Sequence, residues 1–291
     1  MRAVHREYMK KILLAGALVM LIGCSRNTDS PTTLHVAAAA NLSRVFPPLA
    51  RACKAATGLT LVPSFGNTAQ LAQQIENGGP FDLFLAADVK HIQDLDAAHH
   101  VVHDSVHNYA QGRLVLFAPR RPDIHSLADL KLASVKKIGI AKPELAPYGS
   151  ATVEALTNAG LWPAIEPKVV YGQNVSAVLQ FVDSSNVDAA FTALALVQDR
   201  PGEKLTVDPK LHTPIDQALA IPSETAHLDS ARRAAAWFLS AEAQHIFTES
   251  GYGSGSVVLA HGRQVGPQGP KRIATQDPDS SAFQPAATLK P

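Results

Sequence analysis

One repeated pattern constrains the possible fold of this chain most. An apolar segment is followed by a turn of small or polar residues and then by an amphipathic segment. Apolar runs at 34–38 and 59–65 are each followed by a helix-like stretch, and the same pattern returns at 138–156 and 168–182. Strands and helices that alternate in this way are typical of α/β proteins whose sheets are mostly parallel. We therefore expect an α/β fold.

The same periodicities predict the remaining elements. Further strands are expected at 81–86, 113–118, 189–192 and 215–221, with closing helices at 231–240 and 241–250. The first helix is expected to run from Asn41 to Ala56, because Gly58 then ends it.

The first 23 residues have the composition of a signal peptide. Four basic residues precede an apolar run of 11 residues, which is shorter than the about 20 residues that a membrane-spanning helix needs. The run ends in Leu21-Ile22-Gly23-Cys24, which resembles the lipobox of bacterial lipoproteins. That resemblance implies cleavage after Gly23 and a lipid on Cys24. The alternative is an ordinary secretory signal followed by a chance cysteine.

Charge and cysteine content exclude several classes of protein. The chain has 26 Lys+Arg and 25 Asp+Glu, and residues 1–23 contain four of the basic residues and one acidic residue. The remainder therefore has 22 and 24, a net charge of −2, which offers no basic surface to nucleic acid. Two cysteines cannot form a disulfide scaffold or a four-cysteine zinc site. We expect Cys53 to be a buried apolar residue.

Four turns between a strand and a helix share a design that suits an anion. None contains Asp, Glu, Lys or Arg: Ala39-Ala40-Asn41-Leu42, Gly66-Asn67-Thr68-Ala69, Pro147-Tyr148-Gly149-Ser150 and Gln173-Asn174-Val175-Ser176. Free N–H groups at helix N-termini bind anions without a formal cation, and such turns line the cleft of open α/β sheets. A site made of donors favours a fully ionised oxyanion. The alternative is that Asn41, Thr68 and Ser150 are ordinary N-caps.

Three segments resemble the periplasmic molybdate-binding proteins of ABC uptake systems. They are 36–42 (VAAAANL), 64–78 (SFGNTAQLAQQIENG) and 82–88 (DLFLAAD), with looser matches at 147–149 and 246–253. The resemblance covers roughly residues 34–253. It implies a type II periplasmic binding fold, in which two α/β lobes are joined by two crossover strands around a ligand cleft.

The resemblance implies five oxyanion-binding residues. Asn41 and Thr68 stand where the family has serines, and each keeps a side-chain donor. Tyr148 and Val175 stand at helix starts, where the family donates backbone N–H groups. Thr192 stands where the family commonly has a Tyr whose hydroxyl reaches the ligand. Because the Thr192 side chain is shorter than that of Tyr, the resemblance implies a larger site, weaker binding, or a hydroxyl supplied by Tyr148 instead.

The resemblance also implies the division into lobes and the partners, with one lobe from 34–115 and 216–262 and a second lobe at 116–215. From composition we expect a signal peptide at 1–23, a polar linker at 24–33 and a disordered tail at 263–291, the alternative being a tail that wraps the folded body. A monomer anchored through Cys24 at the periplasmic face of a bacterial membrane would bind molybdate or tungstate without a cofactor. It would deliver this ion to an ABC permease and its ATPase.

Other functions stay open at this point. The same fold could bind sulfate, phosphonate or an organic acid. The 3- and 4-residue spacings of His99, His100, His103 and His107 could instead hold a metal on one helix face. An envelope interaction protein with an empty site is a third class. No Walker A, G-x-S-x-G or H-E-x-x-H motif occurs, so no enzymatic activity is expected.

Overall fold

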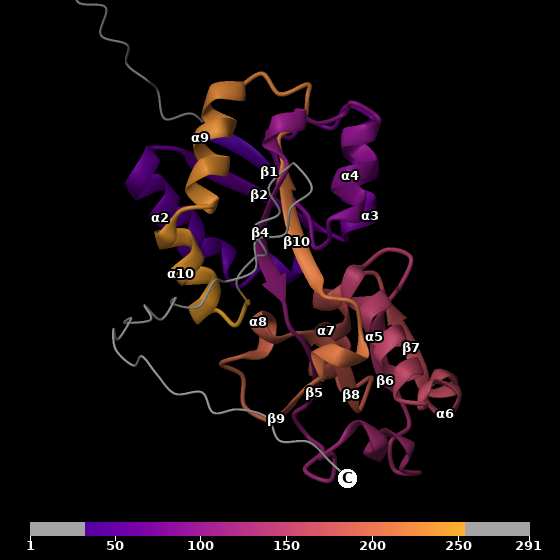
Figure 1. Cartoon of the computed structure of the whole chain (residues 1–291). Helices are drawn as coiled ribbons and strands as arrows, with labels where there is room; N and C mark the ends of the chain where they lie inside the picture. The colour runs from indigo at the N-terminus through magenta and orange to yellow at the C-terminus, as the bar shows by residue number, and fades with distance from the viewer. Residues whose placement is uncertain (1–32, 254–291) are drawn as a thin grey trace, which may run out of the picture.

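The computed structural model describes residues 33–253. The predicted signal peptide, the lipid attachment at Cys24 and the predicted tail at 263–291 lie outside the described residues. Within them, two five-stranded sheets form two α/β units that lie one above the other in Figure 1. None of the helices between residues 33 and 253 has the length and apolar character needed to cross a membrane.

The first sheet has the strand order β2-β1-β3-β10-β4. Its strands are β1 (Thr33–Ala39), β2 (Thr60–Gly66), β3 (Leu83–Leu85), β4 (His107–Gly112) and β10 (Ile215–Ala220). β1 is parallel to β2 and β3, whereas β10 is antiparallel to β3 and β4. Its helices are α2 (Phe46–Thr57), α3 (Thr68–Glu76), α4 (Lys90–Ala97), α9 (Leu228–Phe238) and α10 (Ala241–Glu249).

Helices cover both faces of this sheet, because its strands are apolar on both sides. Leu34, Val36 and Ala38 of β1 belong to the core that also contains residues of α2, α9 and α10. Ala37 points the other way and packs with residues of α3 and α4. Figure 1 shows these two helix groups on opposite sides of β1 and β10.

The second sheet has the strand order β7-β6-β8-β5-β9. Its strands are β5 (Leu114–Ala118), β6 (Ile138–Ala141), β7 (Val169–Gly172), β8 (Ala189–Ala193) and β9 (Glu203–Thr206). Its helices are α5 (Pro147–Asn158), α6 (Trp162–Ile165), α7 (Val175–Asp183) and α8 (Leu194–Val197). Short 3-10 helices complete the fold: η1 (Ala40–Leu42), η2 (His103–Ser105), η3 (Leu127–Lys131), η4 (Glu166–Lys168) and η5 (Pro209–Leu211).

Two antiparallel strands connect the sheets. β4 ends at Gly112 and β5 of the second sheet begins two residues later, while β10 brings the chain back to the first sheet. The pairing of β4 with β10 shifts register between Gln217 and Ala218. These strands are the predicted crossovers, and the predicted fold class is confirmed.

The first helix differs from its sequence-based prediction. Instead of one helix from Asn41 to Ala56, the chain forms η1 and then α2, which begins at Phe46. Pro47 and Pro48 follow directly. Because proline lacks an N–H, it is tolerated in the first turn of a helix and not in its interior. The two prolines therefore fix where α2 can begin.

Candidate functional site

A pocket lies where the two units meet, beyond the carboxyl ends of β1, β2, β6 and β7. It is lined by Ala39, Ala40, Asn41, Gly66, Asn67, Thr68, Ala87, Ala146, Pro147, Tyr148, Asn174 and Val175. The atom-free space is about 210 Å³ with the mouth included. The lining contains no charged side chain, so it fits a small ligand held by neutral groups.

The structure brings together four of the five predicted site residues. Asn41, Thr68, Tyr148 and Val175 all line the pocket. Thr192 does not, although it lies in β8 and is fully buried. Its Oγ1 atom has no hydrogen-bond partner among the described residues.

Three helices present their N-termini to the pocket. α3 begins at Thr68 and is capped by Asn67, whose Oδ1 accepts from Gln70 N at 2.8 Å. α7 begins at Val175 and is capped by Asn174, whose Oδ1 accepts a backbone N–H at 2.9 Å. α5 begins with Pro147, so Tyr148 carries its first free N–H. The first N–H groups of a helix lack intrahelical partners and lie at its positive end.

The Thr68 hydroxyl is placed to donate a hydrogen bond. Its Oγ1 accepts the backbone N–H of Ala87 at 3.2 Å. A hydroxyl that accepts in this way keeps its own hydrogen for another acceptor. Thr68 therefore offers both a backbone N–H and an O–H on one side of the pocket.

The Asn41 side chain turns into the core. Its Nδ2 donates to Gln217 Oε1 at 3.0 Å and to Tyr252 Oη at 3.1 Å. Tyr252 Oη in turn donates to Asn41 O at 2.9 Å. Both amide hydrogens are therefore used within the protein, which leaves the backbone N–H, in the short helix η1, as the donor that Asn41 retains for the pocket. This differs from the side-chain donor expected from the sequence.

Gln217 joins residues on both sides of the pocket. Its Oε1 accepts from Asn41 Nδ2 and from Tyr109 Oη at 2.8 Å, and its Nε2 donates to Tyr148 Oη at 3.1 Å. Burial raises the pKa of the hydroxyls of Tyr109, Tyr148 and Tyr252, which therefore stay protonated as hydrogen-bonding groups. Gln217 lies on a crossover strand, so this network links both units to the connection between them.

Gly112 makes room for this network on the other crossover strand. A Cβ atom at this position would lie 2.2 Å from Tyr148 Oη and 2.8 Å from Gln217 Nε2. Tyr148 thus packs its side chain against the crossover strands while its backbone N–H lies at the start of α5. Neither Gln217 nor Gly112 was identified as a site residue from the sequence.

Two hydrogen bonds close the pocket between the units. Ser176 Oγ donates to Ala40 O at 3.1 Å, and Ala69 N donates to Leu145 O at 3.4 Å. Each bond connects a residue near a pocket-lining helix start on one unit to backbone on the other.

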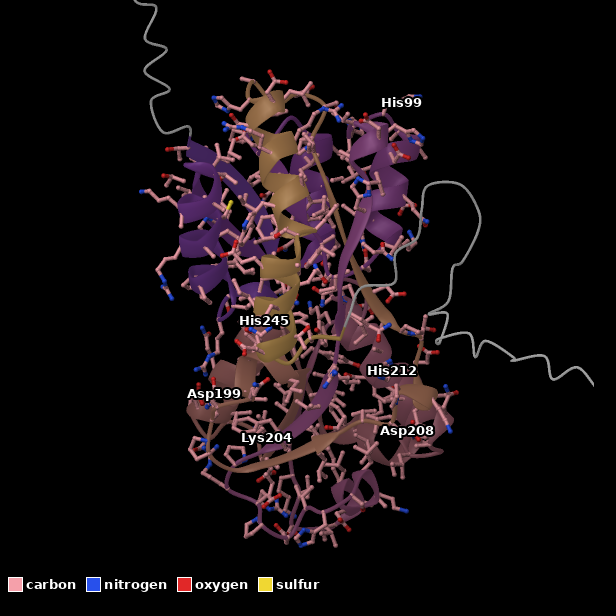
Figure 2. All side chains as sticks on the ribbon, turned by 60° about the vertical axis from the view of Figure 1, so that its left-hand side comes forward. His99, Asp199, Lys204, Asp208, His212 and His245 are labelled. Carbon is pink, nitrogen blue, oxygen red and sulfur yellow. The ribbon has the colours of Figure 1, made fainter. Side chains whose placement is uncertain are left out.

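The clustered histidines do not assemble into a metal site. α4 ends at Ala97, and His99 has a left-handed φ of 62°, so the histidines do not share a helix face. His103 Nδ1 pairs with Asp96 at 2.8 Å, while His107 begins β4. Figure 2 shows His99 at the far end of the first unit. No group of three or more His, Cys, Asp or Glu that could hold a metal gathers within residues 33–253.

Comparison with known proteins relates this chain to extracellular solute-binding proteins. The family model described as "Bacterial extracellular solute-binding protein" matches residues 34–253. The molybdate-binding protein ModA of Azotobacter vinelandii is 32% identical over 225 residues, which cover 76% of this chain and 89% of that protein. YvgL of Bacillus subtilis, named as a candidate ABC transporter substrate-binding lipoprotein, is 30% identical over 258 residues. These residues cover 86% of this chain and 99% of YvgL.

A solved structure of a molybdate-binding protein has a similar fold. The periplasmic molybdate-binding protein of Azotobacter vinelandii matches with a TM-score of 0.72 and 28% sequence identity. The match covers 75% of this chain and 98% of that chain.

Proposed function

The chain belongs to the family of bacterial extracellular solute-binding proteins, and we propose that it captures molybdate or tungstate for an ABC permease. The resemblance found in the sequence is confirmed, because the relatives include molybdate-binding proteins. The observation that carries the choice of ligand is the donor-rich pocket without charged side chains. Hydrogen-bond donors alone suit a fully ionised tetrahedral oxyanion.

The proposed donors come from both units. Thr68 donates its backbone N–H and hydroxyl, and Asn41 its backbone N–H, from the first unit. Tyr148 and Val175 donate backbone N–H groups from the second. The neighbouring Leu145–Ala69 and Ser176–Ala40 hydrogen bonds support a closed arrangement of these donors.

In the proposed mechanism, the ion enters when the two units are apart and is enclosed when they close. Closure removes water from the pocket, and the lower local dielectric strengthens each hydrogen bond to the ion. Thr192 takes no direct part, since it does not line the pocket.

We further propose that the protein acts as a monomer held at the periplasmic face of a bacterial membrane by a lipid on Cys24. A lipoprotein of this kind would present the closed form to the permease and its ATPase. The relative YvgL, named as a candidate lipoprotein, supports this proposal. The proposed lobes are 34–115 with 216–262, and 116–215.

Calorimetric titration of the purified protein with molybdate, tungstate, sulfate and phosphate tests the function. We expect submicromolar binding of molybdate and tungstate, much weaker binding of sulfate, which is smaller, and no binding of hydrogen phosphate. Tighter binding of sulfate would assign the chain to another oxyanion on the same fold. Absence of binding for all four ions would contradict an oxyanion carrier.

A further inference from the structure

Asn67 carries an unused hydrogen-bond donor in the wall of the pocket. It lines the pocket and is 2% exposed. Among the side chains of residues 33–253, its Nδ2 is one of two buried polar atoms without a hydrogen-bond partner. The other is the Thr192 hydroxyl, which lies outside the pocket lining.

The orientation of the Asn67 amide is fixed by the helix that follows it. Oδ1 accepts the backbone N–H of Gln70 at 2.8 Å, as an N-cap does. Rotation of the amide by half a turn would break this bond and bring two N–H groups together. The Nδ2 end therefore remains directed away from the first turn of α3, as a donor only.

Folding alone does not account for an amide at this position. The cap requires one side-chain oxygen, which serine supplies about as well as asparagine. A buried donor without a partner is unfavourable in the closed arrangement of the two units. The nitrogen of Asn67 is therefore a group whose hydrogen bond must come from something that enters the pocket.

We propose that Asn67 Nδ2 donates a hydrogen bond to the bound oxyanion and helps to select it. This inference rests on the proposed function, and adds a residue to the five that the resemblance implies. Because the amide cannot turn to offer its oxygen, Asn67 provides no acceptor for the O–H of an oxyanion that retains a proton. Asn67 thus favours ions that are fully deprotonated at neutral pH.

The substitution Asn67→Ser tests this role, because it keeps the capping oxygen and removes the nitrogen. We expect molybdate to bind about 10- to 100-fold more weakly, as for loss of a hydrogen bond to a charged group. The melting temperature of the ligand-free variant should be unchanged, because the serine still caps α3. A purely structural role would therefore leave molybdate affinity unchanged as well, whereas the proposed role lowers it.

Asn77→Ser is the matched control at the other end of α3. There the amide nitrogen is exposed and donates to Gln73 O at 2.8 Å, so its loss should leave molybdate affinity unchanged. Asn67→Asp is a second variant, which keeps the capping oxygen and places a carboxylate towards the ion. We expect it to abolish binding at neutral pH while the protein stays folded.

The outcomes separate this inference from the proposed function. If the wild-type protein binds none of the oxyanions, the proposed function fails. If the wild type binds molybdate and Asn67→Ser binds it within twofold, the role of Asn67 is overturned and the function stands. Equal losses in Asn67→Ser and Asn77→Ser, or wild-type affinity in Asn67→Asp, would overturn it as well.

Discussion

The Thr68 hydroxyl has two hydrogen-bonding roles that one substitution removes together. Thr68→Val keeps the shape of the side chain but leaves the Ala87 N–H without its acceptor. We expect molybdate affinity to fall at least tenfold, and the free energy of unfolding to fall by about 1–3 kcal/mol for the unsatisfied N–H. Titration calorimetry and urea unfolding measure the two effects. Thr68→Ser keeps the hydroxyl and should keep both molybdate affinity and stability near their wild-type values. Wild-type affinity in Thr68→Val would contradict a donor at this position.

Single residues also show how far sequence could predict the site. The resemblance implied Thr68, Tyr148 and Val175 as site residues, and all three line one pocket, because each lies at a helix start that follows a strand. The Asn41 side chain could not be placed from the sequence, since its partners are 176 and 211 residues away in the sequence. The unpartnered nitrogen of Asn67 was equally hidden, because the turn motif specifies a cap and not what surrounds it.

Among the secondary-structure elements, the crossover strand β10 supports the pocket through Gln217, which does not line it but hydrogen-bonds to Asn41 and Tyr148, which do. Gln217→Leu has similar volume but leaves Asn41 Nδ2, Tyr109 Oη and Tyr148 Oη each with one partner fewer. We expect a loss of about 2 kcal/mol or more in the free energy of unfolding. Affinity for molybdate should also fall, because Asn41 and Tyr148 would both lose the hydrogen bond to Gln217 that helps to position them. Urea unfolding and calorimetry test this.

A solvent-facing glutamine on another strand or helix provides the comparison for Gln217. Gln93 is exposed on α4, and Gln93→Leu should change neither stability nor affinity appreciably. If Gln217→Leu behaves like Gln93→Leu, the buried network does not support the pocket.

Strands with an unbroken apolar run were predicted well from the sequence, and strands without such a run were not. The apolar strands β1, β6 and β8 coincide closely with the predicted runs, because burial on both faces leaves an unbroken apolar pattern. β4 has the sequence HNYAQG, which shows neither an apolar run nor a strict apolar–polar alternation, and it pairs with β10 in the connection between the units. β9 is a four-residue edge strand that contains charged residues, so it too lacks an apolar run and was not predicted.

For the whole molecule, Asp82 joins distant parts of the first unit and predicts an acid-sensitive fold. It accepts from His35 N, Thr225 Oγ1 and His227 Nδ1. Desolvation raises the pKa of Asp82, but the hydrogen bonds from Thr225, His35 and His227 outweigh it and hold the pKa below its usual value. The stability that this group contributes is therefore present above about pH 3.9, the unfolded pKa, and is lost as pH falls through the lower folded pKa.

Asp82→Asn should remove part of this acid dependence. We expect the variant to be less stable than wild type at neutral pH and the difference to shrink below about pH 4. Urea midpoints measured from pH 2 to 7 show both effects. Asp199→Asn is the control, because Asp199 is exposed. Its urea midpoints should change with pH as those of the wild type do. A constant difference across the whole range would contradict the role of Asp82.

In the proposed mechanism, closure of the two units encloses the ion and so involves the whole molecule. The Ser176–Ala40 hydrogen bond crosses the pocket, so it forms only when the units are together. Ser176→Ala should therefore bias the protein towards the open form and weaken molybdate binding about 2- to 12-fold, which corresponds to one neutral hydrogen bond. Calorimetry gives the affinity, and X-ray scattering should show that molybdate still compacts the variant, but at higher concentration.

Ser184→Ala is the control for this prediction, because it removes a hydroxyl from the other end of α7. Ser184 Oγ donates to Gln180 O within its own unit, so its loss cannot favour the open form. If the two variants require the same molybdate concentration for compaction, the cross-pocket bond does not contribute to closure. If only Ser176→Ala requires more, closure and ligand binding share this bond, as expected when the ion is held by donors from both units.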